Sequence, residues 1–371
     1  MKIALVHDHL AQDGGAEKVL KALKEIYPKA PIFTLVFDPK NTNSFFNKQD
    51  IRTSFIQKIP YFGVKKYQWW LSLMPTAVEN YNLMEYDIIL SSASSFAKGI
   101  ITKPGSTHLC YCYTPTRYLW TDTHSYIREL KVNALIKYIL PLTLRELRTW
   151  DQLAANRVDE FIAISQTVRQ RIKKYYGRDS SIIYPPVDTH KFYISHEPKK
   201  YYLAGSRLVP YKKIDLVVKA FSRLNVPIKI FGIGPEEKYL KKLAGKKSNI
   251  EFLGKVSDDE KVKLYSNCIA YINPQEEDFG ITAIEAMASG RPVIAYRAGG
   301  TAETVIDQKT GEFFDEQIWE DIADKIIRFN PDKYNPYYIK MHAQQFNTNN
   351  FKNKIKMLID NYLAVQSDLK L

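Results

Sequence analysis

Two glutamates in the C-terminal half of the chain, Glu277 and Glu285, lie eight residues apart in the segment PQEEDFGITAIEAMASGRPVIA. A carboxylate accepts hydrogen bonds through both oxygens and binds donors more strongly than a neutral acceptor does. These side chains therefore suit the hydroxyls of a sugar and of a ribose. Two glutamates at this spacing are by themselves more typical of a solvated surface, so the surrounding segment must decide between the two interpretations.

That segment has the pattern of a strand, a turn, a helix and a second strand. The parts are the strand end Tyr271–Asn273, the turn at Gly280, the helix Ile281–Ala288, the cap at Gly290 and the strand Arg291–Ala295. Backbone N–H groups at the start of such a helix form an anion site. Open α/β sheets bind ligands at the carboxyl ends of their strands, so this frame favours a binding role for both carboxylates.

A basic segment, GSRLVPYKK, follows the first strand of the C-terminal half. Arg207 and Lys212 lie at this strand-to-helix junction, where two cations can clamp a diphosphate, the arginine in a bidentate manner. A solvated basic turn is the alternative. Glycine-rich turns with Gly232 and with Gly14-Gly15 follow two other strands, and each is either a simple turn or a place where a nucleotide or phosphate approaches the backbone.

The elements that position these residues alternate as short apolar runs and amphipathic helical stretches, which is typical of parallel sheets covered by helices. The expected strands of the N-terminal half are Lys2–His7, Pro31–Phe37, Asp87–Ser91, His108–Tyr113 and Glu160–Ile164. After the segment SIIYPPVD, the expected strands are Tyr201–Ser206, Pro227–Gly232, Ile250–Leu253, Ile269–Ile272 and Arg291–Ala295. The pattern predicts an α/β protein with doubly wound, Rossmann-like domains over residues 1–190 and 191–345. Residues 346–371 are expected to form a helix that packs back toward the N-terminal domain.

The composition narrows the class of protein. With 371 residues and 45% apolar content, the chain can bury two cores. Three cysteines without metal-ligand spacing fit a reducing compartment, and no signal peptide or membrane span is evident. The net charge of +13 indicates an anionic substrate, an anionic membrane surface, nucleic acid, or simply a lysine-rich composition.

The motifs as an ordered set resemble the GT-B fold glycosyltransferases of family 4, which are retaining enzymes that use nucleotide-sugar donors. The matching segments are GGAEK from Gly14, SRLVPYK from Ser206, FGIGP from Phe231, FLGKVS from Phe252, and Glu277 with Glu285. Within the family, YCYTPTRYLW from Tyr111 and IYPPVD from Ile183 are similar to a bacterial mannosyltransferase-like branch that builds surface polysaccharides. The resemblance implies an acceptor domain and a donor domain that face each other across a cleft.

The resemblance also implies roles for individual residues. Arg207 and Lys212 would hold the donor diphosphate, Glu285 the ribose hydroxyls, and Glu277 the transferred sugar. The remaining donor contacts would be the backbone amides of Phe279, Gly280, Ile281 and Thr282, the backbone at Lys255 and Val256 for the base, Gly232 at the nucleotide, and Gly15 from the N-terminal domain. Such enzymes work without a metal, and the chain has no Asp-x-Asp motif at an expected strand end. No metal or other cofactor is therefore expected.

One position departs from the family pattern. Relatives often carry a histidine where this chain has Tyr113, and that histidine contacts the donor sugar. Tyrosine can donate a hydrogen bond but is not cationic at neutral pH. The donor base and sugar therefore stay open, although the branch favours GDP-mannose. His7 and His9 have no third ligand at a suitable spacing and predict no metal site, and His108 is expected to be structural.

Two aromatic and basic segments raise the question of a membrane. Residues 60–83 contain Tyr61, Phe62, Tyr67, Trp69, Trp70 and Tyr81 with Lys65 and Lys66, and residues 132–153 contain Leu140, Leu144 and Leu147 with Arg145 and Arg148. Rings and cations of this kind suit a membrane interface, and a lipid-linked acceptor would explain both segments. The alternative is that these side chains belong to the core of the N-terminal domain. A cytoplasmic location, with peripheral contact at the inner face of the plasma membrane, is expected.

The leading hypothesis is a retaining transfer of a hexose, mannose by branch, from a nucleotide diphosphate sugar to a saccharide acceptor in cell-surface polysaccharide synthesis. A sugar-nucleotide epimerase of similar fold is a second hypothesis, but the sequence shows no clear acid or base for it. A non-catalytic basic protein that binds membrane or nucleic acid is a third, and scattered lysines without a recognisable nucleic-acid motif speak against it. The acceptor, the linkage and the oligomeric state do not follow from the sequence.

Overall fold

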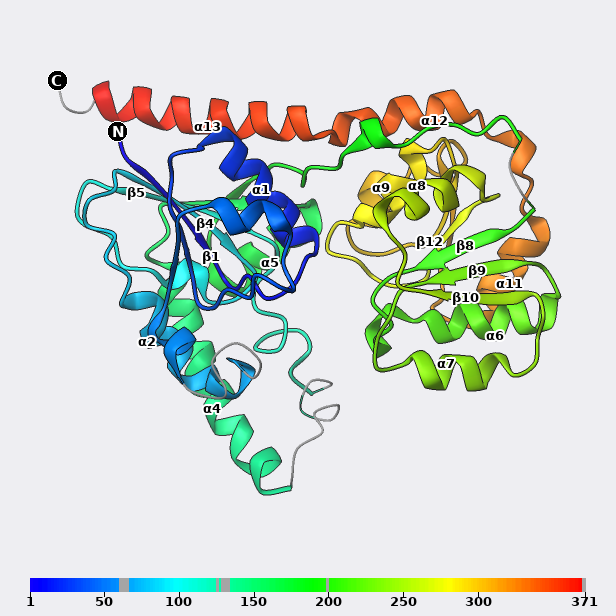
Figure 1. Ribbon diagram of the computed structural model, residues 1–371, viewed down its shortest axis with the longest axis horizontal. Helices are drawn as coiled ribbons and strands as arrows, with labels where there is room; N and C mark the ends of the chain where they lie inside the picture. Colours follow the sequence, from blue (N-terminus) through cyan, green and yellow to red (C-terminus); the bar gives the residue numbers. More distant parts are fainter. Residues whose placement is uncertain (60–66, 125–126, 128–133, 198–199, 369–371) are drawn as a thin grey trace. The chain divides into compact units, whose positions relative to one another are not determined.

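A computed structural model describes residues 1–59, 67–124, 127, 134–197 and 200–368 (Figure 1). Contacts between residues divide the chain into two compact units. The N-terminal unit comprises Met1–Tyr184 and Lys352–Leu371, and the C-terminal unit comprises Pro185–Phe351. Each unit has its own parallel sheet and its own helices.

The N-terminal unit contains a seven-stranded sheet in the order β3-β2-β1-β4-β5-β6-β7, and every pair of neighbouring strands is parallel. The strands are β1 (Ile3–His7), β2 (Ile32–Thr34), β3 (Ile51–Thr53), β4 (Ile88–Ala93), β5 (Thr107–Cys112), β6 (Glu160–Ala163) and β7 (Ser180–Ile182). The central strands β4 and β5 are buried along their whole length. Helices on both faces of the sheet exclude water from both sides, which explains the continuous apolar runs in the sequence.

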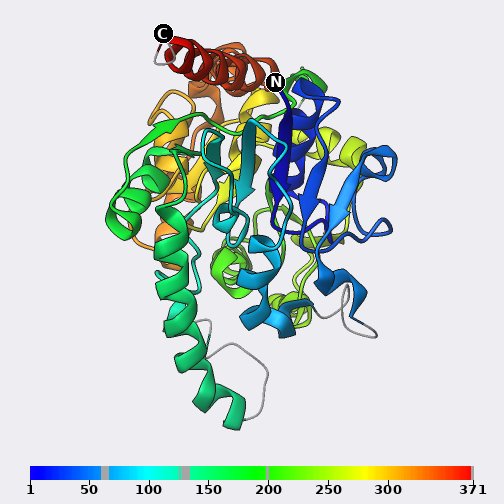
Figure 2. The same ribbon diagram turned by 90° about the vertical axis from the view of Figure 1, so that its left-hand side faces the viewer.

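The helices of this unit are α1 (Gly15–Ile26), α2 (Met74–Glu79), α4 (Ala134–Ala155), α5 (Gln166–Tyr176) and most of α13 (Thr348–Asp368), with short 3₁₀ turns at Ser44–Lys48, Phe55–Lys58, Tyr67–Leu73 and Ala97–Gly99. Helix α1 buries Val19, Leu20 and Leu23 on one face. Helix α4 extends well beyond the sheet at its N-terminal end (Figures 1 and 2). Helix α13 contacts this unit through an ion pair of 2.7 Å between Lys352 and Glu25 and a hydrogen bond from Tyr362 to Glu160.

The C-terminal unit contains a six-stranded parallel sheet in the order β10-β9-β8-β11-β12-β13. The strands are β8 (Tyr202–Gly205), β9 (Ile228–Phe231), β10 (Ile250–Gly254), β11 (Tyr271–Asn273), β12 (Val293–Tyr296) and β13 (Gly311–Phe314). The helices are α6 (Ile214–Leu224), α7 (Glu237–Ala244), α8 (Asp258–Asn267), α9 (Ile281–Ala288), α10 (Thr301–Thr304), α11 (Trp319–Arg328) and α12 (Pro336–Ala343), with 3₁₀ turns at Thr189–Lys191, Pro210–Lys212, Pro331–Lys333 and Gln344–Phe346. This strand order is that of dinucleotide-binding doubly wound folds.

Both sheets therefore have the doubly wound parallel topology that the sequence predicts. In each sheet the chain changes direction of winding at a switch point, between β1 and β4 and between β8 and β11. Ligands of such folds bind beyond the carboxyl ends of the strands at that point. The polar residues considered next follow these strand ends. Among the described residues, the helices include none that is long and apolar enough to cross a membrane.

Candidate functional site

The loop between β11 and α9 carries the most informative motif and begins at the switch point of the C-terminal sheet. It ends at Gly280, whose φ of 94° lies in the left-handed region that favours glycine. A Cβ at this position would lie 2.8 Å from Thr301 Oγ1, so a side chain would not fit. Gly280 therefore lets the chain turn sharply into α9, whose first N–H groups have no partner within the helix itself.

A pair of glycines from the next loop holds this turn in place. The N–H of Gly300 donates to the carbonyl of Glu277 at 2.7 Å, and Glu277 and Gly299 form an isolated parallel bridge. A Cβ at Gly299 would lie 2.2 Å from the Glu277 carbonyl oxygen, and one at Gly300 would lie 2.4 Å from the Cα of Phe279. This pair was not among the residues predicted from the sequence, although a Gly-Gly pair shortly after an expected strand was the available signal.

The ion pair between Lys212 and Glu277 joins the loop after β8 to the loop after β11. Lys212 Nζ lies 2.7 Å from Glu277 Oε1, and the two side chains are 14% and 18% exposed. Burial opposes the charged form of Lys212, but the Glu277 carboxylate outweighs it and the pKa of Lys212 is raised. The structure thus brings together two of the residues that the sequence predicted to bind a donor.

A chain of amide hydrogen bonds supports Glu277 from within the C-terminal unit. Gln275 Nε2 donates to Glu277 Oε1 at 2.6 Å and to Asn273 Oδ1 at 2.9 Å. Asn273 Nδ2 in turn donates to Thr301 Oγ1 at 3.0 Å. Asn273, Gln275 and Thr301 are buried. None of the three was predicted from the sequence, because a buried polar residue carries no signal until its partners are known.

Glu285 lies in the middle of α9 and is 3% exposed. Its Oε1 accepts a hydrogen bond from Lys261 of α8 at 2.8 Å. Behind both glutamates lies Tyr271 of β11, whose hydroxyl donates to the carbonyl of Gly205 at the end of β8 at 2.7 Å. Burial raises the pKa of Tyr271, with a further increase from the carboxylates of Glu277 and Glu285. The two glutamates therefore share one neighbourhood at the switch point, and each is paired with a lysine.

The other expected donor contacts lie on loops at the same edge of the C-terminal sheet. Arg207 directly follows β8 and is exposed, and no hydrogen bond from its guanidinium occurs within the described part of the chain. Gly232, after β9, has a φ of 116°, and a Cβ there would lie 1.8 Å from the carbonyl oxygen of Ser206. This glycine therefore lets the loops after β8 and β9 pack closely. Val256, half-buried, lies between β10 and α8.

In the N-terminal unit, Tyr113 directly follows β5 and supports the first turn of α1. Its hydroxyl donates to the carbonyl of Ala16 at 3.0 Å and lies 2.6 Å from the hydroxyl of Ser92. Burial raises the pKa of Tyr113 well above its usual value, so the hydroxyl stays protonated at neutral pH. Gly15 is the first residue of α1, and the preceding Gly14 N–H donates to Glu17 Oε2 at 2.8 Å.

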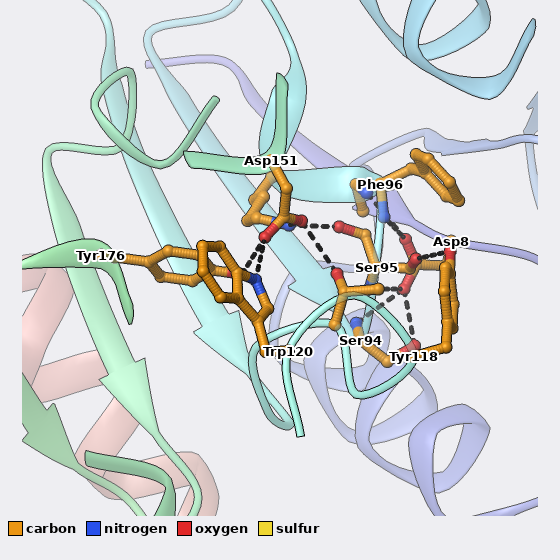
Figure 3. Close-up of polar contacts among 11 residues, drawn as sticks. Asp8, Ser94, Ser95, Phe96, Tyr118, Trp120, Asp151 and Tyr176 are labelled. Atoms are coloured by element: carbon orange, nitrogen blue, oxygen red, sulfur yellow. Dashed lines mark hydrogen bonds and ion pairs between the residues drawn. The ribbon is translucent and has the colours of Figure 1, made fainter. Parts of the chain in front are cut away.

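Asp8, at the end of β1, organises the segment that follows β4 (Figure 3). Its carboxylate accepts five hydrogen bonds, at 2.6–2.9 Å, from the Ser94 N–H and hydroxyl and from the N–H groups of Ser95, Phe96 and Ala97. Burial favours the neutral acid, but nearby histidines and these backbone donors outweigh it and lower the pKa of Asp8. Asp8 therefore stays ionised as a structural anchor. The described residues include no group of three or more His, Cys, Asp or Glu side chains that could hold a metal ion.

A second buried carboxylate, Asp151 of α4, holds the YTPTRYLW segment (Figure 3). It pairs with Lys98 at 2.5 Å, and it accepts hydrogen bonds at 2.8 Å from Thr116, Trp120 and Tyr176. Burial opposes the charge on Lys98, but Asp151 outweighs it and the pKa of Lys98 is raised. The part of the chain that resembles a mannosyltransferase branch is thus fixed to the interior of its unit.

Several residues of the expected membrane segments lie outside the described residues. These are residues 60–66, including Tyr61, Phe62, Lys65 and Lys66, and residues 132–133. Of the others, Leu144 and Leu147 are buried, whereas Tyr138, Leu142 and Leu153 on α4 are 84%, 62% and 57% exposed. One face of α4 is therefore core, and the exposed side carries these three apolar side chains among polar and charged ones.

Two family profiles match successive parts of the chain. Residues 13–191 match the profile described as Glycosyltransferase Family 4, and residues 188–351 match the one described as Glycosyl transferases group 1. The chain belongs to glycosyltransferase family 4. The boundary between the two matches lies close to the boundary between the two compact units. The first match lies largely in the N-terminal unit and the second in the C-terminal unit.

Individual relatives agree with this family. The alpha-1,3/1,6-mannosyltransferase ALG2 of Dictyostelium discoideum is 27% identical over 70% of this chain and 71% of its own length. A GDP-mannose-dependent alpha-(1-6)-phosphatidylinositol monomannoside mannosyltransferase of Mycobacterium tuberculosis is 31% identical over 46% of this chain and 52% of its own length. For several curated relatives, including the latter, the chain spans about half of their length.

A solved structure supports the fold of the family 4 chain. The Anabaena protein Alr3699/HepE in complex with UDP has a TM-score of 0.72 at 18% identity, with 97% of this chain and 100% of that chain covered. At this identity the likeness concerns the fold alone. The family membership and the fold together place the polar residues described above on the framework of a GT-B glycosyltransferase.

Proposed function

We propose that the protein transfers a hexose from a nucleotide diphosphate sugar to a saccharide acceptor with retention of configuration at the anomeric carbon. The observation that carries this proposal is the Lys212–Glu277 pair, which sets a cation and a carboxylate side by side at the switch point of the C-terminal sheet. A sugar nucleotide presents a diphosphate next to a sugar, so it offers a partner for each of the two groups.

The neighbouring residues fit the remaining parts of a donor. Arg207, exposed after β8, and Lys212 would hold the diphosphate, and the first N–H groups of α9 add to the positive potential there. Glu285 would accept from the ribose hydroxyls, and Glu277 would orient the transferred sugar. The N–H groups at Phe279, Gly280, Ile281 and Thr282 would approach the sugar and phosphate. Gly15, Tyr113, Gly232 and Val256 are proposed as further donor contacts.

The reaction itself needs positioning and charge stabilisation more than protein acid–base chemistry. The bond between the anomeric carbon and the diphosphate oxygen breaks, and the acceptor oxygen forms a bond to that carbon on the same face. The acceptor hydroxyl proton passes to an oxygen of the departing diphosphate, so no protein base is required. Arg207 and Lys212 offset the charge that develops on the leaving group, and Glu277 holds the sugar without attacking it.

The donor is proposed to be GDP-mannose. This assignment is supported by the sequence resemblance to a mannosyltransferase branch and by two relatives whose names state mannosyl transfer. One of these acts, by its name, on a phosphatidylinositol mannoside. A lipid-linked acceptor in cell-surface polysaccharide synthesis is proposed on the same grounds, with the chain at the inner face of the plasma membrane. No step of the proposed reaction uses a metal ion.

The exposed apolar side chains of α4 support a peripheral contact with an anionic membrane. Tyr138 and Leu142 lie one helical turn apart, Arg145 is exposed beside them, and the chain carries a net charge of +13. A Tyr138→Ser, Leu142→Ser variant should sediment less with vesicles that contain anionic phosphatidylglycerol. Equal sedimentation of the variant and the wild type would contradict this contact.

The proposed function is tested by incubating the protein with GDP-mannose, UDP-glucose and UDP-N-acetylglucosamine and measuring which nucleoside diphosphate is released. We expect GDP to be released from GDP-mannose, and less UDP to be released from the two UDP-sugars. Calorimetry with GDP should show about tenfold weaker binding for Arg207→Ala, because a charged, bidentate contact is lost. Lys213→Ala is the matched control on the same segment. The absence of any nucleotide release would contradict the proposal.

A further inference from the structure

Gln275 has an environment that its role as a loop residue does not explain. Its side chain is buried, at 1% exposure, and both hydrogens of its amide nitrogen are used: one donates to Glu277 and the other to Asn273. The carbonyl oxygen of the same amide is also buried, and no donor to it occurs among the described residues. A buried acceptor without a donor is costly, so folding stability alone does not favour glutamine here.

The hydrogen bonds of Gln275 fix it firmly relative to the rest of the C-terminal unit. Asn273 is the last residue of β11, and its amide is held in turn by Thr301 at the start of α10. Asn273, Gln275 and Glu277 occupy alternate positions at the start of the loop after β11, and the two hydrogen bonds of the Gln275 amide join their side chains. The amide of Gln275 therefore transmits the position of the strand end to the Glu277 carboxylate.

The two donors to Glu277 converge on one of its oxygens. Lys212 Nζ and Gln275 Nε2 lie 2.7 Å and 2.6 Å from Oε1, and no hydrogen bond to Oε2 occurs in the described part of the chain. This arrangement fixes the carboxylate plane and leaves Oε2 to accept from a ligand. A carboxylate held in this way can receive a sugar hydroxyl without first giving up an existing bond.

We propose that Gln275 is a positioning residue for Glu277 in the sugar-binding part of the site, a role that rests on the proposed function. Lys212 is also assigned to the donor diphosphate, which competes with Glu277 for its ammonium group. Gln275 is neutral, buried and tied to Asn273, so a bound diphosphate does not draw it away. It keeps the carboxylate oriented for the sugar when Lys212 turns toward phosphate.

The test compares Gln275→Met with Gln317→Met in the full chain. Gln317 Nε2 donates to the carbonyl of Pro274 at 2.9 Å, so it supports the same loop without a contact to Glu277. We expect Gln275→Met to lower kcat for GDP release from GDP-mannose about tenfold and to leave the Kd for GDP unchanged, whereas Gln317→Met keeps kcat within about twofold. The thermal unfolding temperature should change little in Gln275→Met. The variant removes the buried Gln275 oxygen that has no donor, but it leaves the Asn273 oxygen without the donor that Gln275 supplied.

A double-mutant cycle separates this role from a general loosening of the loop. If Gln275 acts through Glu277, Gln275→Met should reduce kcat by less than twofold once Glu277→Gln is present. Additive losses in the cycle, or equal losses of kcat in the two methionine variants, would overturn the role of Gln275 while the proposed transferase function stands. A wild-type chain that releases no nucleoside diphosphate from any donor would overturn both proposals together.

Discussion

The ammonium group of Lys212 and the carboxylate of Glu277 lie 2.7 Å apart, although the two residues come from loops that follow different strands. The pair bridges β8 and β11, the two strands between which the winding of the C-terminal sheet reverses. Each charge compensates the burial of the other, so neither is left uncompensated before a ligand binds. A donor with a phosphate and a hydroxyl can then engage both groups at little electrostatic cost.

This relationship predicts that Glu277→Gln affects turnover and nucleotide affinity in different ways. Loss of the carboxylate should lower kcat by about a hundredfold, because the sugar is no longer oriented by a charged acceptor. Lys212 loses its counter-charge at the same time, so the Kd for GDP should stay equal or become smaller. Steady-state kinetics and calorimetry measure the two quantities, and Glu276→Gln is the neighbouring exposed control. Unchanged turnover would remove the role assigned to Glu277.

The second ion pair, between Lys261 and Glu285, predicts a link between α8 and ribose recognition. Lys261→Met removes the lysine that pairs with the buried carboxylate of Glu285. We expect about tenfold weaker binding of GDP, but a smaller change for the 2′,3′-dideoxy form of GDP, which has no ribose hydroxyls for Glu285. Lys263→Met is the control, because Lys263 is exposed and lies two residues after Lys261 on α8. An equal loss for both nucleotides would show that Lys261 acts elsewhere.

The buried pair of Lys98 and Asp151 predicts a stability effect in the N-terminal unit. The side chains are 2% and 1% exposed, so Lys98→Met leaves a buried negative charge without its cation. Such a change should reduce the free energy of unfolding by about 3 kcal/mol, at the lower end of the usual range because Thr116, Trp120 and Tyr176 still donate. Urea unfolding measures the loss. The double variant Lys98→Met, Asp151→Leu should recover part of the lost free energy of unfolding. If the double variant recovers none of it, the loss does not have an electrostatic origin.

His108 predicts how stability depends on pH. Burial lowers its pKa to about 3 in the folded chain, whereas an unfolded chain has the ordinary value of about 6.5. The unfolded state therefore binds one more proton between these values, so His108 costs no stability above about pH 6.5 and destabilises the fold as pH falls below it. The slope is at most about 1.4 kcal/mol per pH unit.

The measurement for this prediction is urea unfolding at several pH values between 6.5 and 5. His108→Gln should flatten the dependence of unfolding free energy on pH, because glutamine does not titrate. The exposed His190→Gln serves as the control and should leave the slope as in the wild type. A slope that is the same in all three proteins would show that other groups dominate acid unfolding.

The fold could be predicted because its signals are local. Short apolar runs predicted the central strands, and the amphipathic stretches between them predicted the helices that cover the sheets. The edge strands β3, β7 and β13 were missed. They have three or four residues each, and β3 and β7 are only partly buried, so neither length nor hydrophobicity separates them from turns.

The sequence by itself determined the two doubly wound sheets, the family, and the order of the motif segments, because each depends on neighbouring residues in a fixed pattern. Only the tertiary structure decided which side chains meet. Gln275, Lys261 and the Gly299-Gly300 pair surround the predicted glutamates, and Asp151 meets Lys98 across 53 residues of chain. Such partners are chosen by strand order and by the packing of loops at the sheet edge. Residue types along the chain do not specify these partners, because a polar residue that becomes buried is not distinguished in the sequence from one that stays exposed.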